Sequence, residues 1–433
     1  MAERIVDAAL SDGGNTATFF LTDHYVIYDY ANDRVRDGVR PLTDFPPGSA
    51  PGFPASFVGT GPANGLDAAL RGKGRFSDAS YYFRGANYMR LRTTPAPVAF
   101  DPADGRSTAA WNLPAAFAAG VDAAFNGALN REPFCYFFKN DQYVRYIWDS
   151  EAVDQGYPKP ISNMVGMPAA FAAGIDAAVD GGGAFADAGY LFKNEQYQKF
   201  QWVATGEPHA ENPIAPIQGN WTGLAELLLA GKAKSQALEW LAAARPRLVQ
   251  LAAGTLAPAD VALVTAALLV HFKTTPADAA GIATIATMLG KVEATLRDSA
   301  NKFRFRTDDE ARADSVPNID AAYTAPFPPG PSTAINFTRN FMARPERNRA
   351  SSVIHEAVHV NDADSASTST HINEWYVTQA LAPALGLPPV ADRPAEFATR
   401  YDTMTPANSL HNPASYATFC RHIFFRADNR EVA

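Results

Sequence analysis

Residues 136–146 read Tyr-Phe-Phe-Lys-Asn-Asp-Gln-Tyr-Val-Arg-Tyr, and residues 190–200 read Tyr-Leu-Phe-Lys-Asn-Glu-Gln-Tyr-Gln-Lys-Phe. In both stretches, aromatic and aliphatic side chains flank a short polar turn, which is Lys-Asn-Asp-Gln at 139–142 and Lys-Asn-Glu-Gln at 193–196. Two apolar runs joined by such a turn predict an antiparallel hairpin. The similarity of the two hairpins indicates an internal repeat.

The repeat occurs four times within residues 1–221. Each copy begins with an Asp-Ala-Ala-apolar tetrad, and an aromatic strand pair follows it. The tetrads start at Asp7, Asp67, Asp122 and Asp176, with spacings of 60, 55 and 54 residues. Short β-rich units at this period predict the blades of a propeller, in which radial repetition leaves few free sheet edges.

This segment resembles hemopexin-like repeats, because residues 136–146 match the family's Tyr-Phe-Phe-Lys signature closely. The resemblance implies an all-β, four-bladed propeller with four inner strands around a central channel. It also implies a cation, Ca²⁺ or Na⁺, held near the channel axis by inner-strand carbonyls. A disulfide commonly joins the first and last blades in this family, but Cys135 and Cys420 are not placed for one. We therefore expect free buried thiols, and closure by packing of the stretch that ends at Trp221 against the first blade.

The four tetrad aspartates have two interpretations. As a functional set, they would form an acidic ring that binds Ca²⁺ or a polyamine at the channel mouth. As a structural set, they would accept hydrogen bonds from backbone donors where each inner strand starts. We favour the structural interpretation.

Residues 222–433 have a helical pattern instead. Proline and an acidic residue mark the first turn of two predicted helices. Residues 307–332 are polar and proline-rich, which predicts a surface loop. We therefore expect a multidomain protein, with a propeller domain at 1–221 and a mainly α domain at 222–433. The spacing of apolar residues predicts helices over 223–253, 259–273 and 277–301.

Residues 355–359 read His-Glu-Ala-Val-His, which is the HExxH pattern. On a helix, His355 and His359 lie one turn apart on the same face, so both imidazoles can bind one ion. Two imidazoles suit Zn²⁺, and Glu356 can take a proton from an attacking water. A strand predicted over 334–341 and a buried helical face at 351–354 favour this interpretation over a surface helix with two histidines by chance.

A catalytic zinc needs a third protein ligand. Four residues downstream of the motif are candidates, and two of them, His371 and Glu374, are neighbours on one face because they lie three residues apart on a predicted helix. If His371 binds the metal, Glu374 becomes a residue that orients a ligand or contacts the substrate. The alternative for His371 is a solvated helix cap. Asp362 and Asp364 are the remaining acidic candidates.

Residues 412–419, Asn-Pro-Ala-Ser-Tyr-Ala-Thr-Phe, together with HExxH resemble the aspzincin (deuterolysin-like, lysine-specific) metallopeptidases. The resemblance covers about residues 330–425 and implies a zincin-type α+β domain with zinc-dependent endopeptidase activity. The middle element departs from the family, because Thr370-His371 replaces its Gly-Thr pair and a histidine stands where the family has aspartate. From the resemblance we therefore predict His371 as the third ligand, with Glu374 as the second choice. Lysine preference would need an acidic pocket, for which Asp392, Glu396 and Asp402 are candidates.

Peptide hydrolysis also needs a group that stabilises the oxyanion. We predict Tyr416 for this role, with Tyr401 and Tyr376 as alternatives. His411 and His422 could also approach the site, but we expect both to be structural. Glu356 would act as the general base.

Composition limits the partners. The chain has 433 residues, a hydrophobic content of 47% and a net charge of −8. A globular acidic protein is a poor partner for nucleic acid or anionic membranes. The longest apolar stretch, 261–270, is too short to span a bilayer. The first residues lack the pattern of a signal peptide, so we expect synthesis in the cytoplasm and, for any external role, export or injection by a leaderless route.

These features predict a zinc endopeptidase that acts on a protein or peptide, with a propeller that binds an unknown ligand. A delivered toxin or effector is one form of this prediction. The alternative is a ligand- or partner-binding propeller protein whose second domain binds metal without catalysis. The presence of Glu356 favours catalysis, because a purely structural zinc site does not need a general base.

Overall fold

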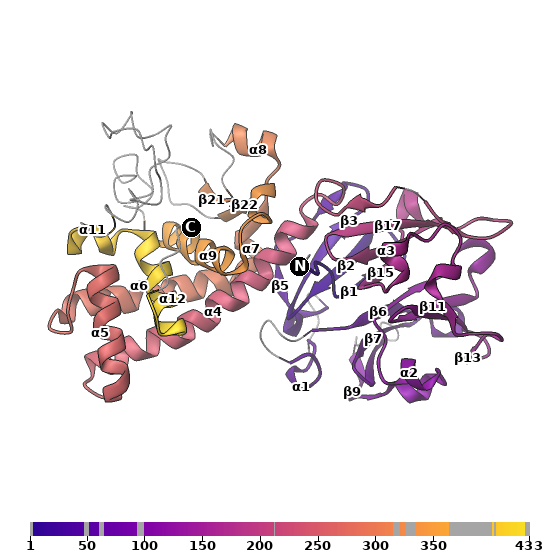
Figure 1. The fold of residues 1–433 in the computed structure, drawn as a ribbon, viewed down its shortest axis with the longest axis horizontal. Helices are drawn as coiled ribbons and strands as arrows, with labels where there is room; N and C mark the ends of the chain where they lie inside the picture. The colour runs from indigo at the N-terminus through magenta and orange to yellow at the C-terminus, as the bar shows by residue number, and fades with distance from the viewer. Residues whose placement is uncertain are drawn as a thin grey trace. The chain divides into compact units, whose positions relative to one another are not determined.

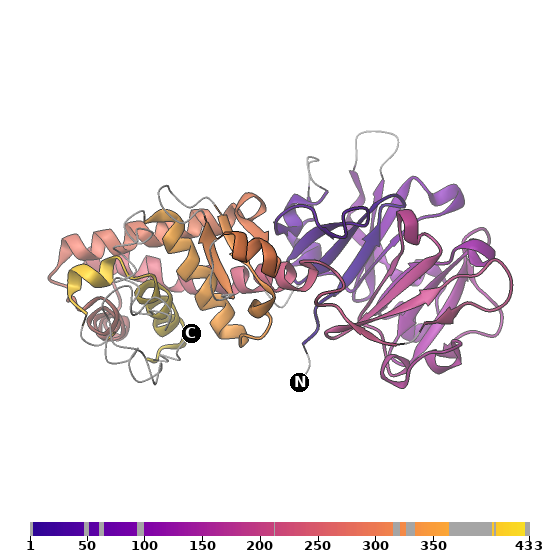
Figure 2. The same cartoon turned by 90° about the horizontal axis from the view of Figure 1, so that it is seen from above.

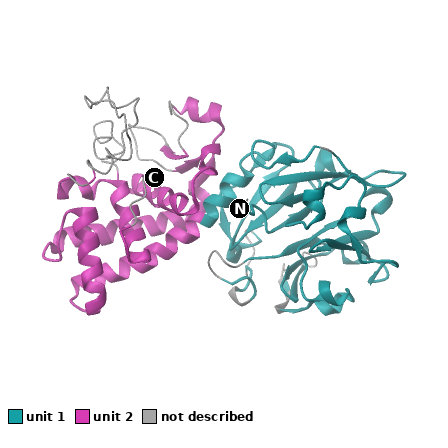
Figure 3. Ribbon diagram, viewed as in Figure 1, with its two compact units in different colours: residues 1–232 teal, residues 233–433 magenta. Residues whose placement is uncertain are grey.

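The chain divides into two compact units in the computed structural model, Met1–Lys232 and Ala233–Ala433 (Figure 3). The boundary falls inside helix α4 (Leu224–Ala252), and each unit has its own buried core. The structure describes residues 3–46, 52–59, 65–92, 99–211, 213–314, 321–325, 334–362, 401 and 404–428.

Within its described residues, the first unit contains four antiparallel sheets that follow the four sequence repeats (Figure 1). The first sheet comprises β1 (Ala8–Ser11), β2 (Thr16–Leu21), β3 (His24–Asp29), β4 (Arg34–Val35) and β5 (Arg40–Pro41). The second comprises β6 (Ala68–Arg71), β7 (Ala79–Arg84), β8 (Asn87–Arg92) and β9 (Ala99–Ser107).

The third and fourth sheets repeat the strand order of the first sheet. The third comprises β10 (Ala123–Asn126), β11 (Phe134–Lys139), β12 (Gln142–Ile147), β13 (Ala152–Val153) and β14 (Lys159–Pro160). The fourth comprises β15 (Ala177–Asp180), β16 (Ala188–Lys193), β17 (Gln196–Gln201), β18 (His209–Ala210) and β19 (Ala215–Pro216). Short helices connect successive sheets: α1 (Ala55–Val58), α2 (Ala115–Ala118) and α3 (Ala169–Ala172).

The register confirms the predicted hairpins. Lys139 pairs with Gln142 and Lys193 pairs with Gln196, which leaves a two-residue turn between the second and third strands of each sheet. The first strands of the four sheets contact one another in a closed ring, in the order β1, β6, β10, β15 and back to β1. Figure 2 shows the same unit from above. This arrangement is that of hemopexin-like blades around a shared axis.

Packing, not a disulfide, closes the ring. Trp221 is buried between Phe19 of the first sheet and Phe192 of the fourth, with ring centroids 5.3 and 5.2 Å away. Cys135 and Cys420 are both free and buried. The expected closure by the stretch ending at Trp221 is therefore confirmed.

The second unit is mainly helical. Among the described residues, a three-stranded sheet accompanies the helices, with β22 (Ala334–Phe337) in the centre, parallel to β20 (Phe303–Phe305) and antiparallel to β21 (Ala322–Ala325). In the described residues, its elements beyond α4 are α5 (Pro258–Phe272), α6 (Ala279–Arg297), α7 (Ser299–Lys302), β20 (Phe303–Phe305), α8 (Asp308–Ala313), β21 (Ala322–Ala325), β22 (Ala334–Phe337), α9 (Glu346–Asn361), α11 (Pro406–Leu410) and α12 (Pro413–Phe425).

Two predictions for this unit need correction. The strand expected over 334–341 ends at Phe337, because Thr338 caps a short 3-10 helix and its hydroxyl accepts from the Asn340 amide. The loop expected over 307–332 contains α8 and β21. Helix α8 forms because Thr307 and Glu310 make a capping box.

Among the helices that the structure describes, none is both long enough and apolar enough to cross a bilayer.

Candidate metal site

Helix α9 carries the HExxH motif and lies at the centre of the second unit. It begins after Pro345, and its residues 350–354 are buried. The helix contacts α6 and α12 as well as strands β21 and β22. Contacts on several sides hold the helix in a fixed orientation, which is what a ligand-bearing helix needs.

The two histidines of the motif point their outer nitrogens at one place. The Nε2 atoms of His355 and His359 lie 3.3 Å apart. Two Zn–N bonds of about 2.0–2.1 Å at a tetrahedral angle place their nitrogens about 3.3 Å apart. His359 is buried, whereas His355 is partly exposed, so the pair meets solvent on one side. The geometry therefore fits a zinc ion held by both imidazoles.

Glu356 is the residue next to His355 on the same helix. Its side chain is nearly buried, with 8% of its surface exposed. A carboxylate on the same helix as the two converging imidazoles could receive a proton from a water at this place. The predicted role of Glu356 rests on this position.

The end of α9 carries a second polar pair. Asp362 follows His359 by three residues, and its carboxylate lies 3.0 Å from His411 Nδ1. Tyr416 is fully buried, and its hydroxyl donates to the Leu410 carbonyl at 2.8 Å. Burial and then the Asp362 charge raise the pKa of Tyr416. The Tyr416 hydroxyl thus binds the backbone here, and its predicted role with an oxyanion remains a prediction.

Tyr401 belongs to a different group. Its hydroxyl lies 2.8 Å from His271 Nδ1 and 2.7 Å from the Thr418 hydroxyl. His271 Nε2 in turn lies 3.0 Å from His422 Nδ1. Ligand atoms of His271, His422 and Asp428 all lie within 4.8 Å of one another.

No sequence motif predicts a metal-binding role for His271 or Asp428. The available signal was a histidine in the last turn of an apolar helix, since His271 follows Val270 and precedes Phe272. The predicted residues His371, Glu374 and Tyr376 lie outside the described residues. So do Asp364 and the three acidic candidates for substrate preference: Asp392, Glu396 and Asp402.

The four tetrad aspartates of the first unit are turn-capping residues. Each accepts a hydrogen bond from the backbone amide at the two-residue turn of its own sheet. The N···O distances lie between 2.6 and 2.7 Å for the pairs Asp7–Thr22, Asp67–Gly85, Asp122–Asn140 and Asp176–Asn194. All four turn residues have positive φ angles, near +50°. The structural interpretation is confirmed, although the donors belong to these turns and not to the inner-strand starts.

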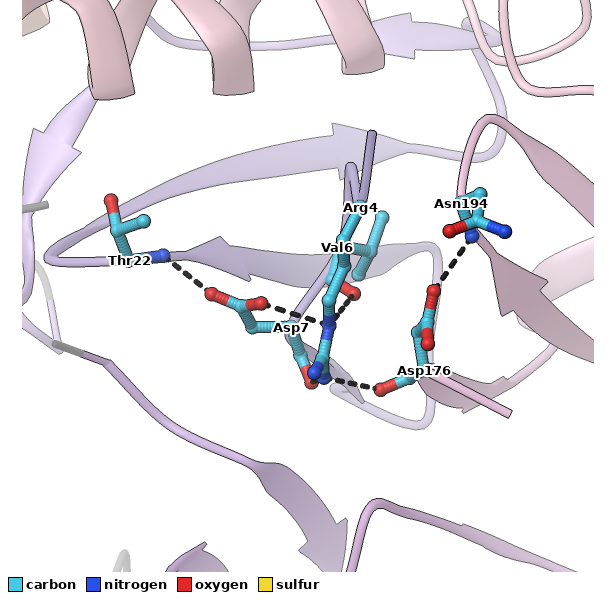
Figure 4. A network of polar contacts seen from close by, with 6 residues as sticks. All are labelled: Arg4, Val6, Asp7, Thr22, Asp176 and Asn194. Atoms are coloured by element: carbon cyan, nitrogen blue, oxygen red, sulfur yellow. Dashed lines mark hydrogen bonds and ion pairs between the residues drawn. The ribbon is translucent and has the colours of Figure 1, made fainter. Parts of the chain in front are cut away.

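Arg4 places a positive charge beside two of these aspartates (Figure 4). Its guanidinium lies 3.0 Å from the Asp7 carboxylate and donates to the Asp176 carbonyl at 2.7 Å. Burial raises the pKa of Asp7, whereas Arg4 lowers it. The channel cation implied by the resemblance, Ca²⁺ or Na⁺, stays a prediction.

Comparisons with known proteins concern the first half of the chain. A family model described as Hemopexin matches residues 121–169. Albumin-2 of Lathyrus sativus is 25% identical over 235 residues, which cover 50% of this chain and 94% of the relative.

Solved structures of plant proteins align with a similar share of the chain. The seed albumin LS24 from Lathyrus sativus is 24% identical, covers 53% of this chain and 99% of its own, and has a TM-score of 0.41. A plant lectin with two metal binding sites from Cicer arietinum is 24% identical, and the match covers 50% of this chain and 95% of the lectin, with a TM-score of 0.40. From the family match and the four ring-forming sheets, the N-terminal half of this chain has a hemopexin-like fold.

Proposed function

We propose that this chain is a two-part protein, in which the hemopexin-like unit binds a ligand or partner and the helical unit binds a zinc ion through His355 and His359. The family match supports the binding role of the first unit. The 3.3 Å separation of the two Nε2 atoms carries the metal proposal.

The finer proposal is that the second unit is a zinc-dependent endopeptidase. When bound, a zinc ion would polarise a scissile carbonyl and lower the pKa of water. His355 and His359 would hold the ion, and Glu356 would accept the proton of the attacking water and pass it to the leaving amine. The position of Glu356, adjacent in the chain to His355 and nearly buried, supports this division of roles.

The alternative is a binding protein whose helical unit holds metal without hydrolysis. The comparisons support this alternative better than the peptidase, because the part of the chain that they match is the hemopexin-like half, to which both proposals assign binding. Delivery as a toxin or effector stays a prediction, as does synthesis in the cytoplasm.

The first test is the zinc content of the purified full chain after reconstitution, measured by elemental analysis. Substitution His355→Gln/His359→Gln should remove one zinc, and Glu356→Gln should retain it. Substitutions His371→Ala and Glu374→Ala assign the third ligand, because only the true ligand should weaken this zinc. The metal proposal is overturned if the double variant His355→Gln/His359→Gln holds as much zinc as wild type.

A peptide-library screen then separates the two functions. Cleavage by wild type that is absent in Glu356→Gln supports the endopeptidase. Zinc retention without cleavage of any library peptide supports the binding-protein alternative.

A further inference from the structure

We propose that His271, His422 and Asp428 form a second divalent metal site, for which Zn²⁺ is the best-matched ion. Two imidazoles and a carboxylate are ligands that zinc takes in proteins. These residues lie on α5, on α12 and just beyond the end of α12, whereas the HExxH pair lies on α9. The site uses none of the residues of the proposed peptidase.

The separations of the ligand atoms fit one ion. His271 Nε2 and His422 Nδ1 lie 3.0 Å apart, close to the separation of about 3.3 Å for two tetrahedral Zn–N bonds. The Asp428 carboxylate lies within 4.8 Å of both nitrogens. The Asp428 side chain is exposed, so the site meets solvent on that side.

The ring nitrogen of His271 that faces away from the proposed ion is held by hydrogen bonds, as is usual for a metal-ligating histidine. Its Nδ1 lies 2.8 Å from the Tyr401 hydroxyl and 3.2 Å from the Thr418 hydroxyl. Such partners fix the orientation of the ring and direct the other nitrogen to the ion. His271 is fully buried and His422 is 6% exposed, so protein surrounds the two imidazoles.

The chain after α12 turns so that Asp428 returns to His422. Arg426 adopts a left-handed conformation with φ of 56°, and the Ala427 amide donates to the His422 carbonyl. The Arg426 side chain reaches Asp260 on α5 at 2.8 Å. This pairing draws the guanidinium to Asp260 at the opposite end of α5 from His271.

A bound ion would therefore tie α5 to the end of α12. Helices α5 and α12 pack against each other (Figure 1), so the ion would strengthen an existing interface. Three protein ligands leave a fourth position for water on the exposed side of Asp428. An ion that binds only the folded chain raises its stability by mass action.

The competing explanation is a simple hydrogen bond between the two imidazoles. In that case one ring nitrogen donates to the other, and Asp428 is not needed. The two explanations differ in the effect of Asp428 on zinc affinity.

The test uses the full chain with His355→Gln/His359→Gln, so that the α9 pair is absent. Zinc affinity is measured by competition with a chromophoric chelator, and the melting temperature is measured with and without zinc. We expect one zinc per chain and a higher melting temperature in zinc. Adding Asp428→Asn should weaken affinity at least tenfold and remove the thermal shift.

Asp309→Asn is the matched control, because it removes the same charge from a side chain that is 96% exposed in the same unit. Its zinc affinity should equal that of the parent. The proposal is overturned if the parent binds no zinc, or if Asp428→Asn binds zinc as tightly as Asp309→Asn. Asp428 is chosen for substitution because it is exposed, so that Asp428→Asn leaves the core intact. The buried His422 is not used, because His422→Gln could prevent folding.

Discussion

The ring of Trp221 packs edge to face against Phe19, with centroids 5.3 Å apart. Phe19 lies on the second strand of the first sheet, whereas Trp221 follows the last strand of the fourth. Trp221 also contacts Tyr190 of the fourth sheet at 4.9 Å. A single indole thus joins the two ends of the four-sheet ring.

We expect Trp221→Ala to destabilise the first unit by about 3–5 kcal/mol, the usual range when a buried Trp or Phe is truncated. The loss combines removed apolar contact with a cavity between the first and fourth sheets. Trp221→Phe should cost less, because a ring still fills part of the space. Denaturant unfolding followed by circular dichroism measures both changes.

Trp111→Ala is the matched control. Trp111 is buried between Phe83 of the second sheet and Phe137 of the third, with centroids 5.4 Å from each. Its loss should destabilise the unit similarly. Only Trp221→Ala should also increase proteolysis of the first sheet, since it alone separates the chain-terminal blades. Equal proteolysis of the two variants would contradict closure by Trp221.

Arg4→Gln should lower the stability of the first unit by about 1 kcal/mol at pH 7. Arg4 donates to the Val6, Asp7 and Asp176 carbonyls, and it pairs with the Asp7 carboxylate. Its side chain is 41% exposed, so solvent weakens the ion pair. The hydrogen bond to Asp176, which joins the chain start to the fourth sheet, supplies much of the effect.

The loss should depend on pH. The folded pKa of Asp7 lies above its unfolded value of about 3.9, so ionisation of Asp7 opposes folding as pH rises through that window. Removal of Arg4 raises the folded pKa further and widens the window. The destabilisation should therefore be smaller at pH 4 than at pH 7. Arg36→Gln, from an exposed pair with Asp37, should show little effect at either pH.

Much of the first unit could be predicted from the repeat. The polar turns at 139–142 and 193–196 set the register of their hairpins, because a two-residue turn fixes which residues pair. The aspartate tetrads were correctly interpreted as structural. Their exact donors were not, because the turn that Asp122 caps is eighteen residues away and comes close only through strand pairing.

The second unit was less predictable for physical reasons. The alternation in 334–341 favours a strand throughout, but the Thr338 hydroxyl offers the backbone a competing hydrogen bond. The site of His271 needs residues from α5, α12 and the segment beyond it, and no local pattern records that proximity. The helix-borne pair His355 and His359 was predictable because four residues make one turn.

Asp176→Ala should destabilise the first unit by about 1.5–3 kcal/mol, the usual range for loss of a hydrogen bond to a charged group. The Asn194 amide donates to the Asp176 carboxylate at 2.6 Å, and Asn194 is a turn residue with φ of 53°. Asp176→Asn retains an acceptor oxygen and should cost less. Thermal unfolding compares the two variants, and an equal loss in both would mean that charge, not capping, is the role of Asp176.

Glu356→Gln tests catalysis most directly. If Glu356 is the general base, the substitution should lower kcat about 10²–10⁴-fold, because the amide cannot accept the proton of the attacking water. Zinc content and melting temperature should stay near those of wild type, since glutamine has the same shape and His355 and His359 remain. Glu346→Gln, the same change in the first turn of α9, should leave kcat unaltered.

Unchanged cleavage by Glu356→Gln would remove Glu356 from the mechanism. A zinc-loaded wild type that cleaves no peptide would identify the helical unit as a metal-binding partner of the hemopexin-like half.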